Sequence, residues 1–124
     1  MILIALGSPK LQDPNLVYAF LDDTYRHISQ KDTLIIHYGN TLKGTDGFIT
    51  EWLDERSKAR DRVEGIILNE ITDETLPKEA AVAAIFFQEE DENKEANKYV
   101  ELLEAKTIVI EKYRSHNFLP KGNE

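Results

Sequence analysis

A chain of 124 residues is long enough for one domain with a single core, and 41% hydrophobic with 31% charged residues is typical of an ordinary globular protein. A formal net charge of −8 excludes non-specific binding to nucleic acid or to an anionic membrane surface, because both need clustered Lys and Arg. Cysteine is absent, which excludes a disulfide framework, a thiol nucleophile and a Cys-ligated zinc.

The first element is the continuous apolar run at residues 2–6, which is typical of a strand covered on both faces. It has no basic flank and ends at Gly7-Ser8-Pro9, so we expect neither a signal peptide nor a membrane span. We therefore expect a cytoplasmic protein with no membrane partner.

The rest of the chain alternates helical patterns with short apolar runs. Pro14 can open a helix with Asp13 as its N-cap. The further predicted elements are a strand at 33–37, a helix from 46 to about 60, strands at 63–68 and 81–87, a helix at 93–104 and a strand at 107–110. We expect one Rossmann-like domain over residues 1–113 and a C-terminal tail of low order over 114–124.

Strands that alternate with helices predict a parallel sheet with right-handed crossovers. The expected fold is α/β, a three-layer α/β/α sandwich with a parallel Rossmann-like sheet of about five strands. In such sheets ligands bind outside the carboxyl ends of the strands, where the strand order reverses. The loops expected at this edge are residues 7–13, 37–46, 69–73 and 88–93.

The loop after the second strand is the most informative segment. A strand, a loop with two glycines and a helix is an arrangement that presents backbone N–H groups to an anion. Lys43 is the cation placed for a phosphate in this loop. The candidate ligand-binding residues are Gly7, Ser8, His37, Gly39, Asn40, Lys43, Gly44, Thr45 and Asp46.

Each candidate also has a purely structural interpretation. The glycines can be turn residues, Thr45 or Asp46 can cap the second helix, and His37 can be a structural histidine at a strand end. Trp52 fits the core or a dimer contact better than a base-stacking platform. His27 and His116 fit the surface, and no residues have metal-ligand spacing, so we expect neither a metal site nor a cofactor.

The motifs of the first half resemble a known family. Its members, the DprA/LOG-like Rossmannoid proteins of the SLOG superfamily and especially the small YspA-like proteins, have Gly-Ser-Arg after the first strand. Their second strand ends in a His-Gly-Gly type loop, followed by Gly-Ala-Asp and a helix bearing a Trp. Gly7-Ser8 is similar to the first motif, and His37, Gly39, Gly44, Thr45, Asp46 and Trp52 are similar to the second. The resemblance implies binding or processing of nucleotides or nucleotide-derived ligands, and some relatives cleave N-glycosidic bonds.

The second half departs from this family. The family's arginine after Gly-Ser is Pro9 here, and the Arg-Asn pair expected after the third strand is missing, since residues 69–78 contain no arginine. The glycine loop expected after the fourth strand is replaced by the acidic run Gln88-Glu-Glu-Asp-Glu92, which would repel a phosphate. The sequence therefore keeps half of the family's anion-binding apparatus.

Three functional hypotheses remain. The first is a binding module for a nucleotide or nucleotide-derived ligand with little or no catalysis. The second is a hydrolase of N-glycosidic or phosphate bonds, with Asp46, Glu51 or Glu89 as acid–base. The third is an acidic protein-interaction module on a degenerate Rossmann-like fold. We also expect a homodimer, because the helices carry many aromatic residues: Tyr18, Phe20, Tyr25, Phe48, Trp52 and Tyr99.

Overall fold

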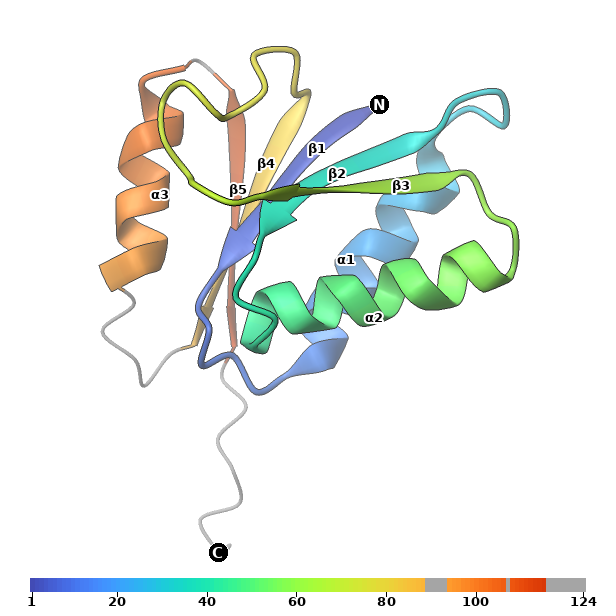
Figure 1. The fold of residues 1–124 in the computed structure, drawn as a ribbon, viewed down its shortest axis with the longest axis horizontal. Helices are drawn as coiled ribbons and strands as arrows, with labels where there is room; N and C mark the ends of the chain where they lie inside the picture. Colours follow the sequence, from blue (N-terminus) through green and yellow to red (C-terminus); the bar gives the residue numbers. More distant parts are fainter. Residues whose placement is uncertain (89–93, 107, 116–124) are drawn as a thin grey trace, which may run out of the picture.

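A computed structural model describes residues 1–88, 94–106 and 108–115 of the chain. Figure 1 shows the arrangement of its helices and strands. In chain order they are β1 (Ile2–Gly7), α1 (Pro14–His27), β2 (Leu34–Gly39), α2 (Gly44–Lys58), β3 (Val63–Leu68), β4 (Val82–Gln88), α3 (Lys94–Glu104) and β5 (Val109–Ser115).

The strands form one five-stranded sheet in the order β3-β2-β1-β4-β5, and every pair is parallel. This confirms the predicted Rossmann-like α/β fold. The chain leaves β1 toward β2 on one side and later returns to β4 on the other. The strand order therefore reverses between β1 and β4, which is where open α/β sheets have their ligand crevice.

The two faces of the sheet are covered unequally (Figure 1). Helices α1 and α2 cover one face, where the core includes Leu3, Ile36, Trp52 and Phe86. The other face has α3, and its core includes Ile4, Ile85 and Leu103. The connection from β3 to β4, residues 69–81, contains no helix, although all of its residues are described. Where a helix could have covered the sheet, this connection instead contributes Leu76 to the core on the α3 face.

Helix α1 begins as the sequence predicts. Pro14 is its first residue, and the Asp13 carboxylate accepts a hydrogen bond from the Asn15 N–H at 3.1 Å. Proline suits this position because its missing N–H would have had no partner inside the helix. This cap fixes the direction in which the chain leaves β1.

Several element boundaries differ from the prediction, most clearly in β2, α2 and β5. Strand β2 continues past His37 to Gly39, because its ladder with β3 extends to the pair Gly39↔Leu68. Helix α2 begins at Gly44 instead of Asp46. Strand β5 begins at Val109 and extends two residues into the predicted tail, ending at Ser115; residues 116–124 lie outside the described residues. Strand β5 is an edge strand, which is held by its hydrogen-bond ladder with one neighbour and can carry polar side chains. The prediction followed apolar content alone and therefore placed β5 wrongly.

The domain itself accommodates the helical aromatic side chains. Trp52 is buried and meets Tyr25 edge to face, with ring centroids 6.4 Å apart. Tyr18 and Phe48 contact each other on the α1–α2 side, and Phe20 packs against Phe86. Among the described residues, the large apolar side chains that are exposed are instead Met1, Leu42, Ile67 and Val109. In the described part of the chain, no helix is long and apolar enough to cross a membrane.

Candidate functional site

The loop after β1 crosses the point where the strand order reverses. The Ser8 N–H donates to the Phe86 carbonyl of β4 at 2.9 Å, directly after Gly7 ends β1. Further along, the Gln12 N–H donates to the Gln88 side-chain oxygen at 3.1 Å. The loop is therefore tied to the carboxyl end of β4.

The loops after β1 and β2 are joined through Ser8 and Thr45. The buried Ser8 carbonyl accepts hydrogen bonds from the Thr45 N–H at 3.2 Å and from the Thr45 hydroxyl at 3.0 Å. Gly44 lies against the same turn with a φ of +53°, and a Cβ added there would lie 2.5 Å from the Pro9 carbonyl carbon. Glycine is required at position 44 by both its backbone conformation and this close approach.

Asp46 holds the loop after β2 in place through hydrogen bonds. Its buried carboxylate accepts hydrogen bonds from the Thr41 hydroxyl at 2.8 Å and from the Thr41 N–H at 3.2 Å. A Cβ on Gly39 would lie 2.5 Å from the Asp46 Oδ2 atom, so a side chain at this position would displace the Asp46 carboxylate. Burial raises the pKa of Asp46 above 3.8, although hydrogen bonds from Thr41 and Gly39 act in the opposite direction.

The outer segment of the loop, residues 40–43, is exposed. Leu42 is 65% exposed and has a φ of 62°, a left-handed conformation that is uncommon for a bulky side chain. Lys43 occupies the N-cap of α2 without a side-chain capping bond, and the Asn40 amide donates weakly to Asn69 at 3.5 Å. The exposed segment therefore presents the Asn40 amide, the Leu42 side chain and the Lys43 ammonium, while the hydrogen bonds of Thr45 and Asp46 hold the rest of the loop.

The first turn of α2 is partly occupied by the protein's own carbonyl groups. The Thr45 N–H bonds to Ser8, and the Gly47 N–H bonds to the Lys43 carbonyl at 3.5 Å. The N–H groups of Gly44 and Asp46 take no part in these bonds. Two N–H groups of the first turn, those of Thr45 and Gly47, are therefore already bonded within the protein.

His37 does not lie in this cluster. It is inside β2, paired with Ile4 and Ile66, and its side chain lies on the sheet face opposite the buried Tyr38. Its Nδ1 atom is buried and has no hydrogen-bond partner among the described residues. Burial lowers the pKa of His37, while Glu79 and Glu64 act in the opposite direction. The expectation that His37 ends the strand is corrected, because the ladder continues to Gly39.

Two of the three acid–base candidates, Asp46 and Glu51, are bonded to different partners. Glu51 accepts a hydrogen bond from the Tyr18 hydroxyl at 3.2 Å, on the α1–α2 side of the domain. The Asp46 carboxylate is instead bonded to Thr41. Glu89 and the other acidic residues of the run, at positions 90–92, lie outside the described residues, as does His116; His27 is exposed. Among the described residues, no group of three His, Cys, Asp or Glu could hold a metal ion.

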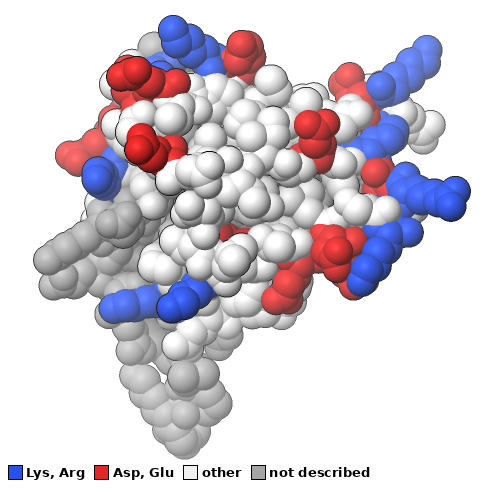
Figure 2. Space-filling view, in the orientation of Figure 1, with Lys and Arg blue, Asp and Glu red and all other residues white. Residues whose placement is uncertain are grey.

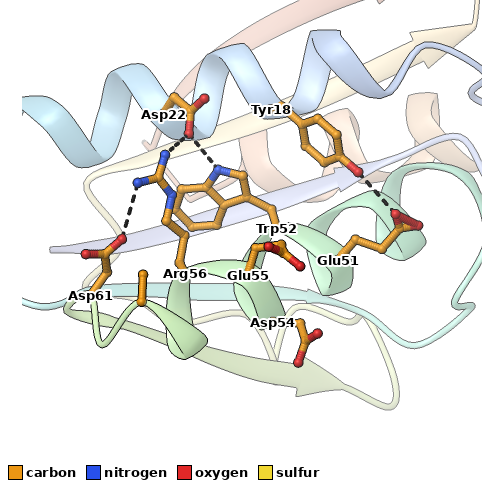
Figure 3. A pocket seen from close by; sticks show the side chains of 9 residues that line it. Tyr18, Asp22, Glu51, Trp52, Asp54, Glu55, Arg56 and Asp61 are labelled. Carbon is orange, nitrogen blue, oxygen red and sulfur yellow. Dashed lines mark hydrogen bonds and ion pairs between the residues drawn. The ribbon is translucent and has the colours of Figure 1, made fainter.

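The structure also shows a groove between α1 and α2 that the sequence analysis missed (Figure 3). Its volume is about 500 Å³. The residues that line it are Tyr18, Asp22, Glu51, Trp52, Asp54, Glu55, Arg56, Ala59 and Asp61. The spacing of Tyr18 and Asp22 on α1, and of Trp52 and Arg56 on α2, was a usable signal, because residues four apart share one helix face.

Arg56 is held at the centre of this groove. Its guanidinium pairs with Asp22 and with Asp61, the latter at 3.2 Å, and lies 5.2 Å from the centroid of the Trp52 ring. The Trp52 indole N–H donates to Asp22 at 2.8 Å. Although burial acts against it, hydrogen bonds with Asp22 and Asp61 raise the pKa of Arg56. The remaining acidic side chains, Glu51, Asp54 and Glu55, are exposed at the groove and give it negative charge.

No family model matches the chain, and no curated protein or solved structure matches it either.

Proposed function

We propose that the protein binds a nucleotide or nucleotide-derived small molecule at the carboxyl edge of the sheet and performs little or no catalysis on it. The site consists of the exposed segment 40–43, which is held from behind by the buried turn at Gly7 and Ser8. The resemblance to SLOG proteins at Gly7-Ser8 and Gly44-Thr45-Asp46 supports this proposal, as does the position beside the reversal of strand order.

The observation that carries the proposal is the exposed Leu42 on a rigidly held loop. A left-handed backbone costs free energy at a bulky residue, and such conformations cluster at ligand-binding segments. Leu42 offers an apolar contact for a base or ribose, and the neighbouring Lys43 offers a charge for a phosphate. The hydrogen bonds that Thr41 donates to the Asp46 carboxylate keep the loop ordered before binding, which reduces the entropy lost on association.

The contacts of Asp46 favour binding over catalysis. A hydrolase would need a carboxyl group directed at the substrate, with dipoles or cations placed where charge develops. Asp46 is instead buried and bonded to its own loop, and Pro9 stands where the related proteins carry an arginine. Incubation with nucleoside monophosphates tests the hydrolase alternative: turnover that Asp46→Asn abolishes would favour it over a binding module.

The binding proposal is tested by thermal shift with AMP, ADP-ribose and a cyclic dinucleotide as probes. A probe at one hundred times its dissociation constant should stabilise the fold by about 2.7 kcal/mol. Lys43→Ala should reduce that stabilisation. Lys31→Ala is the matched control, because Lys31 is an exposed lysine in the loop between α1 and β2, at the opposite end of β2. Equal shifts for both variants would contradict the placement of the phosphate at Lys43.

The α1–α2 groove supports the acidic protein-interaction module as a second candidate. Exposed carboxylates beside Tyr18 and the Arg56–Trp52 stack fit a Lys- or Arg-rich segment of another protein. A basic peptide should bind with an affinity that falls as salt rises, and Glu55→Gln should weaken it. Glu101→Gln on α3 is the control, because Glu101 is also exposed but belongs to the helix on the other sheet face.

A further inference from the structure

Strand β3 is an open edge of the sheet. It pairs with β2 along its whole length, from Leu34↔Val63 to Gly39↔Leu68, and no strand follows it in the sheet order. An edge strand presents a row of unpaired N–H and C=O groups that can pair with another strand. β3 lies in the foreground of Figure 1.

The two edges of the sheet differ in charge. The other edge strand, β5, carries Glu111, Lys112 and Arg114, whereas Glu64 is the charged residue of β3. Charged side chains, lysine in particular, are a common protection of edges against pairing. Figure 2 shows charged side chains mainly around the margin and a largely uncharged area across the middle, where β3 lies in Figure 1. Only the β5 edge is therefore protected in this way among the described strands.

The side chains of β3 are complementary to those of a second β3. Ile67 is 48% exposed and Gly65 is exposed, and both lie on the face that α2 covers, since their partners Tyr38 and Ile36 belong to that core. In antiparallel pairing about a two-fold axis at Ile66, the Ile67 of each copy lies opposite the Gly65 of the other. The position that a Gly65 side chain would take is filled by Leu53 and Tyr38, whose nearest atoms lie 2.6 Å and 3.1 Å from an added Cβ, so the Ile67 of the other copy would lie against these side chains. On the other face, the two Ile66 side chains meet.

We propose that β3 pairs antiparallel with β3 of a second copy of this chain, with the two-fold axis at Ile66. The two sheets then form one continuous sheet. This mode places the dimer at a strand edge and not on the helical aromatic residues, which pack within the domain. The inference does not depend on a ligand at the carboxyl edge, because the groups it uses belong to β3 alone.

The mass of the protein in solution tests the proposal. Light scattering at micromolar concentration should give twice 14.2 kDa for the unaltered chain and 14.2 kDa for Ile67→Lys. Val109→Lys is the matched control: Val109 is a β-branched residue on the other edge strand, is 64% exposed, and its replacement should leave the dimer intact. A monomeric unaltered chain would overturn the proposal, as would equal masses for both variants.

A cross-link tests the register directly and is independent of whether Ile67→Lys folds. The chain contains no cysteine, so Ile66→Cys introduces a single thiol in each copy. Residues directly opposite in an antiparallel pair have Cα atoms about 4.5–5.5 Å apart, within the range of a disulfide. Mild oxidation should give a covalent dimer for Ile66→Cys and not for Val109→Cys. A failure of Ile66→Cys to cross-link, or equal cross-linking of both variants, would overturn this register.

Discussion

Leu42 and Asp46 lie at the same loop, after β2, but differ in burial and in structural role. Asp46 is buried and bonds to Thr41, so it orders the loop, whereas Leu42 is exposed in a left-handed conformation and gains no burial in return. The sequence predicts both positions as part of a glycine loop, but it does not show that Asp46 is buried while Leu42 is exposed. The buried hydrogen bonds of Thr45 depend on the approach of the loop after β1, which local patterns do not reveal.

Replacement of Leu42 by glycine distinguishes the effect of backbone strain on stability from the effect of the side chain on ligand binding. Leu42→Gly should leave stability unchanged or raise it by up to about 1 kcal/mol, because glycine adopts the left-handed backbone without steric cost. The same change should weaken binding of the nucleotide probe through loss of the apolar contact. Arg60→Gly, at the other non-glycine residue with a φ of 62°, should have a similar effect on stability and none on binding. Chemical denaturation and probe titration of both variants check this.

The raised pKa of Asp46 predicts a specific pH dependence. A carboxyl whose pKa is higher in the folded state than 3.8 binds more protons in that state than in the unfolded chain, over the pH range between the two values. As pH rises through this range, the unaltered protein should lose stability relative to Asp46→Asn. Urea denaturation of both proteins at several pH values measures the difference. A difference that stays constant, or changes in the opposite direction, would contradict the buried position of this carboxylate.

At the scale of elements, sequence patterns predicted those with strong local signals. Strand β3 has the predicted bounds Val63–Leu68, and α1 begins at its Asp13-Pro14 cap. The pattern failed where tertiary contacts decide the boundary, as in β5, whose bounds follow from its ladder with β4. The groove between α1 and α2 was missed for the same reason, since it depends on how two helices face each other.

The pairing of α1 with α2 depends on the contact between Asp22 and Arg56. Arg56→Ala should destabilise the fold by about 1–2 kcal/mol, through the lost stacking on Trp52 as well as the lost ion pair, which is only half-buried. Asp22→Asn should cost less, because its remaining side-chain oxygen can still accept the Trp52 N–H. A double-mutant cycle should give a coupling of about 0.5–1 kcal/mol, and additive effects would show that the pair contributes nothing.

At the scale of the whole molecule, the parallel sheet accounts for the position of the candidate site. The strand order places the loops after β1 and β2 side by side at one edge, as the alternation of strands and helices predicts. It also explains the position of His37: alternation along β2 turns this side chain to the sheet face, away from the loop that follows. The open β3 edge could not be predicted, because the strand order is a property of the assembled sheet.

Ligand binding at the carboxyl edge is tested most directly by backbone amide chemical shifts during titration with AMP or ADP-ribose. We expect shifts for residues 40–46 and for Gly7 and Ser8, with little change in β5 or at the Trp52 indole N–H. Shifts confined to the α1–α2 groove, or no shift for either probe at millimolar concentration, would contradict it.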